Sequence, residues 1–111
     1  MRSGHAACRF GGEEFALLLV ESGREEAAAV ALRVRERVAA LEIMAAGVPL
    51  TRTVSLGAAA SDDFAASTLT REAIVEAADQ ALYAAKRGGR NRVCLAPPRT
   101  MAGPLTACAV G

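Results

Sequence analysis

Two long helical patterns, each followed by a short strand-like run, restrict this chain to a mixture of helices and strands. In both patterns apolar residues recur at intervals of three and four, and charged residues fill the opposite face. Thr70 is a good N-terminal cap for the second helix, and Gly88-Gly89 is a suitable end for it. The expected helices are 24–41 and 70–87, and the expected strands after them are 50–60 and 91–95.

The N-terminal part reads as a β-hairpin. Strand-like runs at 8–10 and 16–20 flank Gly11-Gly12, and both central positions of a two-residue type I′ turn need a positive φ. The element order is then a hairpin followed by α-β-α-β, which predicts an α/β domain with helices packed on a mostly antiparallel sheet. Residues 96–111 are rich in Pro, Ala, Gly and Thr without periodicity. We therefore expect a domain over 1–95 and a flexible tail over 96–111.

Composition predicts a thin core and excludes several classes of protein. The apolar fraction is 52%, but 26 of the 111 residues are alanine, and 12 of these lie in the two helical patterns, where they allow close packing. The net charge of +1 provides no basic surface for nucleic acid or membrane lipid. No apolar run approaches the ~18 residues that span a membrane. We expect neither a nucleic-acid partner nor a membrane span.

The cysteines and the N-terminus favour a cytoplasmic protein. Cys8, Cys94 and Cys108 are an odd set, widely spaced and without a C-x-x-C pair, which predicts reduced thiols rather than a disulfide framework or a zinc site. Cys8 and Cys94 are expected in the core. No secretory signal follows Met1.

The segment Gly11-Gly12-Glu13-Glu14 is the most informative chemical feature. Two glycines expose bare backbone that a ligand can approach closely. Successive strand side chains point to opposite faces, so only one of the two glutamates can face a given site. A carboxylate beside bare amides suits Mg²⁺-assisted phosphate chemistry, because Mg²⁺ prefers oxygen ligands. The alternative is an ordinary exposed hairpin with solvated glutamates.

Three blocks of sequence resemble the GGDEF domains, which are diguanylate cyclases. Residues 9–15, Arg-Phe-Gly-Gly-Glu-Glu-Phe, resemble the family signature in its Gly-Gly-Glu-Glu-Phe form. Residues 53–59 resemble the family strand that contains Ser-x-Gly. Residues 78–86, followed by Gly-Arg-Asn at 89–91, resemble the late helix and its turn. The resemblance covers residues 9 to 93 and implies a palm-like α+β fold.

The resemblance implies that two GTP molecules are condensed into cyclic di-GMP, with release of two pyrophosphates, by two GGDEF domains that face each other. Gly11 and Gly12 would lie against the nucleotide. Glu13 would bind Mg²⁺ (or Mn²⁺) and help to deprotonate the attacking 3′-hydroxyl, and Glu14 would support the site.

Lys86 and Arg90 match the family's phosphate contacts. They are four residues apart and would share a face if the helix continued through both. Lys86 is also the only lysine among the 13 basic residues. The alternative is that both are ordinary cations at the C-terminal end of a helix dipole.

Two departures from the family pattern are expected to affect activity. Only ten residues precede Gly11, so the family's N-terminal strand and helices, with a second metal-binding aspartate, are not in this chain; we expect impaired cyclase activity. Many members also have an Arg-x-x-Asp site that binds the product. Here Arg2 is present and His5 replaces the aspartate, while Arg33 matches a further arginine of that site. His5 offers fewer acceptors to a guanine than a carboxylate does.

Two other functions remain open. The first is an inactive GGDEF remnant that binds nucleotide, cyclic di-GMP or a GGDEF partner. The second is a separate α/β interaction module with a chance Gly-Gly hairpin.

Overall fold

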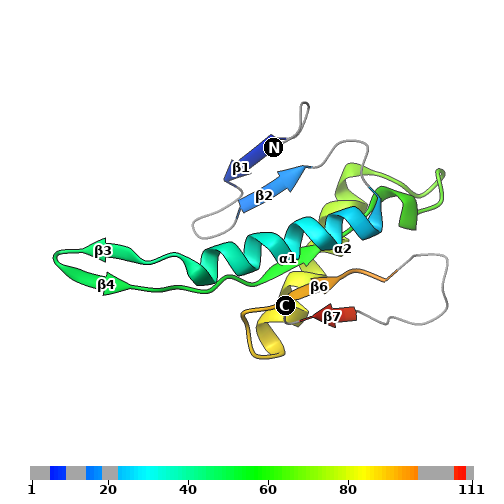
Figure 1. Ribbon diagram of the computed structural model, residues 1–111. Helices are drawn as coiled ribbons and strands as arrows, with labels where there is room; N and C mark the ends of the chain where they lie inside the picture. Colours follow the sequence, from blue (N-terminus) through cyan, green and yellow to red (C-terminus); the bar gives the residue numbers. More distant parts are fainter. Residues whose placement is uncertain (1–5, 10–14, 19–22, 98–106, 110–111) are drawn as a thin grey trace.

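The computed structural model describes residues 6–9, 15–18, 23–97 and 107–109 (Figure 1). It is a mixed α+β fold, as predicted, and three of its four strand pairings are antiparallel. The elements are β1 (Ala6–Arg9), β2 (Phe15–Leu18), α1 (Arg24–Ala40), β3 (Ile43–Ala45), β4 (Val48–Leu50), β5 (Leu56–Ala58), the 3-10 turn η1 (Ser61–Asp63), α2 (Arg71–Arg87), β6 (Val93–Leu95) and β7 (Ala107–Ala109).

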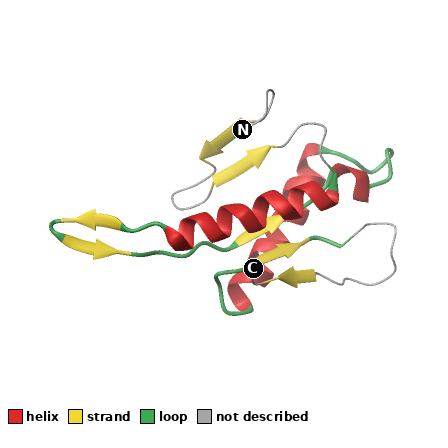
Figure 2. Ribbon diagram, in the orientation of Figure 1, coloured by secondary structure: helices red, strands yellow, loops and turns green. Residues whose placement is uncertain are grey.

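The described strands form three small sheets. The hairpin strands β1 and β2 pair with each other, as do β3 and β4, and the third sheet has the order β5-β6-β7. Because β5 and β6 are parallel, α2 crosses over between them. In Figure 2, α1 lies in front of β5 and α2 lies behind it, so this small sheet is covered on both faces.

Helix α2 packs closely on the sheet, and three of its alanines form the core together with Cys94 and Ala96. The predicted limits of this helix are confirmed to within one residue, and the Thr70 hydroxyl accepts a hydrogen bond from Ala73 N at 3.0 Å. Ala77, Ala81 and Ala85 are almost fully buried. The predicted apolar stripe of α2 thus faces the sheet, with a small residue at each turn.

Gly57 in β5 makes this close packing possible. A Cβ at this position would lie 2.1 Å from Leu82 N and 2.3 Å from Ala78 O, which are backbone atoms of α2. No side chain fits into that space, because real Cβ atoms essentially never approach other atoms so closely. The glycine of the Ser-x-Gly block therefore sets the distance between strand and helix.

Helix α1 is anchored at its N-terminal end. Arg24 Nη1 lies 2.6 Å from Asp63 Oδ2 in η1 and donates to Ala96 O after β6 at 2.5 Å. One guanidinium therefore joins three segments that are far apart in the sequence. Ala31 is the one residue of α1 that is buried, so the predicted apolar face of this helix is mostly half-exposed.

The segment after α1 differs from the prediction of one strand over 50–60. Instead β3 and β4 form a hairpin that projects beyond the end of α1 in Figure 1, and only Leu56–Ala58 forms the later strand. The turn residues of the β3–β4 hairpin, Ala46 and Gly47, both have positive φ, 51° and 79°. This left-handed geometry matches the twist of the two strands. The sequence Ala-Gly does not predict such a turn.

Strand β7 and a disulfide correct two predictions for the C-terminal part. Residues 107–109 pair with β6 within the segment where we expected a flexible tail. The register places Cys94 directly opposite Cys108, and the two form a disulfide with a Cα–Cα distance of 4.0 Å. The prediction of reduced thiols is therefore wrong for this pair. Spacing along the chain could not indicate that two cysteines 14 residues apart meet across a strand pair. Cys94 is buried in the core, as expected.

Reduction of this disulfide is expected to lower the free energy of unfolding by about 3 kcal/mol, because the cross-link closes a loop of about 15 residues. Urea denaturation with and without dithiothreitol measures the change. The Cys108→Ser variant should show the same loss and no further response to dithiothreitol. Three titratable thiols in the denatured, unreduced protein would contradict the assignment.

Among the described residues, no helix has the length and apolar character needed to cross a membrane.

Candidate functional site

The strands β1 and β2 carry the signature segment between them. Their register pairs Arg9 with Phe15, so five residues, 10–14, join the last paired positions. A two-residue turn at Gly11-Gly12 would pair Arg9 with Glu14, so the register differs by one residue from that prediction; the turn residues themselves lie outside the described part of the chain. The four site residues Gly11, Gly12, Glu13 and Glu14 lie outside the described residues, as do Arg2 and His5.

Lys86, Arg90 and Arg33 are the predicted site residues that the structure describes. Lys86 lies in the last turn of α2 and is half-buried, whereas Arg90 is exposed in the turn that follows. Since α2 ends at Arg87, the two cations do not share a helical face, contrary to the prediction for a continuing helix. Arg33 is exposed on α1.

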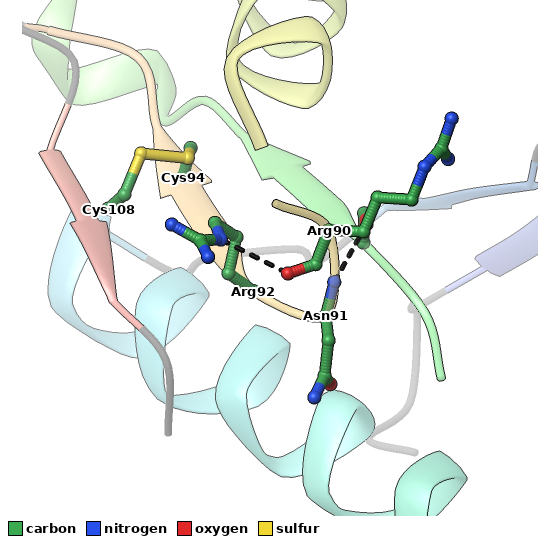
Figure 3. The surroundings of a disulfide bond; sticks show 6 residues. Arg90, Asn91, Arg92, Cys94 and Cys108 are labelled. Carbon is green, nitrogen blue, oxygen red and sulfur yellow. Dashed lines mark hydrogen bonds between the residues drawn. A yellow bond between two sulfur atoms is a disulfide. The ribbon is translucent and has the colours of Figure 1, made fainter. Parts of the chain in front are cut away.

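The turn between α2 and β6 is the best-defined part of the site (Figure 3). Arg90 N donates to Ala85 O at 3.0 Å, which closes the end of α2. Asn91 N donates to Ser55 Oγ at 3.1 Å, and Arg35 Nε donates to Asn91 O at 2.9 Å. These bonds attach the turn to α1 and to the segment that leads into β5.

Arg92 stabilises the same turn from the other side. Its Nε donates to Arg90 O at 3.1 Å. A Cβ at Gly89 would lie 2.7 Å from Arg92 Nη2, so the guanidinium lies directly over this glycine. In Figure 3 the side chain of Arg90 extends away from the turn, whereas that of Arg92 lies on the opposite side. The side chain of Arg90 thus points away from the turn, whereas the side chain of Arg92 makes contacts within it.

Every charged residue from 86 to 92 is basic. Of these, Arg87 packs against Tyr83, with its guanidinium carbon 5.5 Å from the ring centroid, a cation–π geometry. Arg90 is exposed, and the guanidinium group is a natural partner for phosphate oxygens. The turn can therefore offer positive charge to an anionic ligand.

The sequence did not predict Arg35, Ser55 and Asn91 as members of this site. Ser55 and Asn91 both lie within the quoted blocks, but nothing local indicates that they touch, since they are 36 residues apart. The one available signal was Asn91 itself, because asparagine after a helix end often takes the left-handed conformation.

No group of three or more His, Cys, Asp or Glu side chains that could hold a metal ion occurs among the residues described. The predicted metal ligand, Glu13, lies outside them.

Comparison with known proteins identifies the family. A sequence model for "Diguanylate cyclase, GGDEF domain" matches residues 1–92. The chain is 40% identical to Diguanylate cyclase A of Treponema denticola over 94 residues, which cover 85% of this chain and 24% of that protein. It is 38% identical to Diguanylate cyclase DosC of Escherichia coli over 94 residues, or 84% of this chain and 20% of that protein. The chain thus spans about a quarter or less of the length of these curated relatives.

A solved structure supports the same assignment at the level of the fold. The GGDEF domain of DgcB from Caulobacter crescentus, crystallised with c-di-GMP, superposes with a TM-score of 0.75 and 32% identity. The match covers 85% of this chain and 54% of that one. Sequence and fold agree, and the chain belongs to the GGDEF domain family of diguanylate cyclases.

Proposed function

We propose that this domain, paired with a second GGDEF domain, condenses two GTP molecules into cyclic di-GMP. In each of two steps a ribose 3′-hydroxyl attacks the α-phosphorus of the other GTP, its proton goes to a base, and pyrophosphate leaves. The observation that carries the proposal is the basic turn after α2, which presents Arg90 outward in a chain whose hairpin bears the family signature.

Lys86 and Arg90 are proposed to bind the phosphates of GTP. Arg90 is exposed next to a helix end, and its backbone is held by hydrogen bonds on both sides. Because the backbone is fixed before the ligand arrives, only the side chain of Arg90 has to lose conformational freedom on binding. Lys86 lies one turn earlier, at the C-terminal end of α2.

The hairpin residues are proposed to provide the reacting end of the site. Gly11 and Gly12 would lie against the nucleotide, Glu13 would accept the proton of the 3′-hydroxyl and ligate the cation, and Glu14 would support Glu13. A bound Mg²⁺ or Mn²⁺ would neutralise phosphate charge during the displacement. A polypeptide of these 111 residues alone is expected to turn over slowly, because one hairpin carboxylate is an incomplete site for Mg²⁺.

Incubation of the purified protein with GTP and Mg²⁺, followed by chromatography and mass spectrometry, tests the proposal. Cyclic di-GMP and pyrophosphate in a 1:2 ratio are the expected products, and the rate should rise with protein concentration because two domains must meet. Binding of GTP by calorimetry without any product would favour the alternative of a nucleotide-binding or dimerisation module. If the protein neither binds GTP nor forms product, both the cyclase proposal and this alternative are contradicted.

Binding of cyclic di-GMP at Arg2, His5 and Arg33 is expected to be weak, and His5→Asp should tighten it about tenfold. A carboxylate can accept two hydrogen bonds from a guanine edge, whereas an imidazole accepts at most one. One added charged hydrogen bond is worth about 1.5 kcal/mol, which corresponds to about tenfold in Kd.

Isothermal titration of cyclic di-GMP into both proteins measures this change. Arg33→Ala in the His5→Asp background should reverse most of the gain, since Arg33 is exposed and can reach a ligand. An unchanged Kd in His5→Asp would remove these residues from any product-binding site.

A further inference from the structure

The backbone of the turn after α2 adopts a conformation that one of its residues, Arg90, does not favour. Gly89, Arg90 and Asn91 are three consecutive residues with positive φ, 120°, 65° and 51°. Glycine takes this region freely and asparagine tolerates it, but arginine is disfavoured there because of its Cβ. Such outliers persist only where surrounding contacts hold them, and they cluster at functional sites.

The contacts that hold the turn in this conformation come from parts of the chain that are distant in sequence. Ser55 Oγ accepts the hydrogen bond of Asn91 N, and Arg35 Nε donates to Asn91 O, so both backbone polar groups of Asn91 are bound by side chains. Both interactions are partly buried. In contrast, Asn91 Oδ1 is buried and has no hydrogen-bond partner among the described residues. The surrounding residues therefore hold Asn91 by its backbone and not by its side-chain oxygen.

We propose that Ser55 and Arg35 are positioning residues for Arg90. By clamping Asn91 from two sides, they keep the preceding residue in the left-handed region and aim its exposed guanidinium outward. This inference rests on the proposed function, in which Arg90 binds a phosphate of GTP. Neither Ser55 nor Arg35 touches the nucleotide in this arrangement, and both act through the turn.

Steady-state kinetics with GTP provide the first test. Ser55→Ala and Arg35→Lys should each raise KM for GTP about tenfold and change kcat less than threefold, because a phosphate contact made in both ground and transition states affects binding alone. Ser55→Thr keeps the hydroxyl and should restore a near-normal KM. The matched controls Ser67→Ala and Arg37→Lys, both exposed, should leave KM unchanged.

A double-mutant comparison separates positioning from general stability. In an Arg90→Ala background, Ser55→Ala should change KM less than twofold, since the residue through which it acts is gone. A tenfold rise that persists in that background would overturn the proposal.

Substitutions of Asn91 test the role of the backbone. Asn91→Gly keeps the amide, the carbonyl and the left-handed conformation, so KM should stay within about threefold of the wild-type value. Asn91→Ala disfavours that conformation and should raise KM as much as Ser55→Ala. Equal effects of the two substitutions would overturn the positioning role.

Hydrogen exchange gives a readout that does not depend on turnover. The Asn91 amide should exchange at least tenfold faster in Ser55→Ala than in the wild type or Ser67→Ala, while amides in the middle of α2 are unchanged. If the wild type neither binds nor converts GTP, the proposed function fails. Hydrogen exchange at Asn91 still shows whether Ser55 and Arg35 hold the Asn91 backbone. Unchanged exchange at Asn91 would overturn the clamp.

Discussion

Replacing Glu13 by glutamine is expected to lower the rate of cyclic di-GMP formation at least about a hundredfold. The change removes one negative charge and one base while it preserves the size of the side chain. Loss of a general base alone typically costs a factor of 10² to 10⁴, and the same carboxylate is proposed to ligate the cation. The initial rate of product formation at saturating GTP and Mg²⁺ measures the effect.

Two matched variants make this result specific. Glu14→Gln should have a smaller effect, because Glu14 is proposed to support Glu13 and not to accept the proton or ligate the cation itself. Glu42→Gln, an exposed glutamate just before β3, should leave the rate unchanged. A Glu13→Gln protein that keeps more than a tenth of the wild-type rate would contradict the role assigned to this carboxylate.

Gly57→Ala is expected to lower the free energy of unfolding by at least about 3 kcal/mol, at the upper end of what overpacking usually costs. The added methyl group would meet backbone atoms of Leu82 and Ala78 at 2.1 and 2.3 Å, and backbone cannot rotate away as a side chain can. Helix α2 must then separate from β5, which opens the alanine core. The melting temperature should fall by at least about 12 °C.

Gly47→Ala is the control for this experiment. Nothing lies within 4 Å of a Cβ at Gly47, so the substitution is strained only by the positive φ of 79°. We expect a loss of about 1 kcal/mol, the usual penalty for a residue with a Cβ in that region. Calorimetry or urea denaturation of both variants gives the comparison. Equal losses would show that the contact between α2 and β5 does not depend on the glycine.

Several elements of the fold followed from local sequence. The limits of α2 were predicted from the spacing of Ile74, Ala77, Ala81 and Ala85 and from the cap at Thr70, and both are confirmed. Helix α1 ends one residue from its predicted limit. Helices are predictable in this way because their hydrogen bonds and capping groups lie within a few residues of each other.

Strand limits were predicted less well. The β-branched residues Thr51, Thr53 and Val54 suggested one long strand, whereas the structure has β4 before them and β5 after them. A strand exists only where a neighbour supplies hydrogen bonds, and β5 finds its neighbour in β6, more than thirty residues later. Propensity alone does not reveal that neighbour.

The sequence by itself determined the family, the helices and the small-residue character of the core. Those properties are carried by contiguous motifs and by local periodicity. The tertiary structure alone decided that Cys94 meets Cys108 and that Ser55 and Arg35 clamp Asn91. These contacts join positions 14, 36 and 56 residues apart, and they form only when the chain closes around α2. Sequence spacing cannot encode such pairings, because their geometry depends on how every element between them packs.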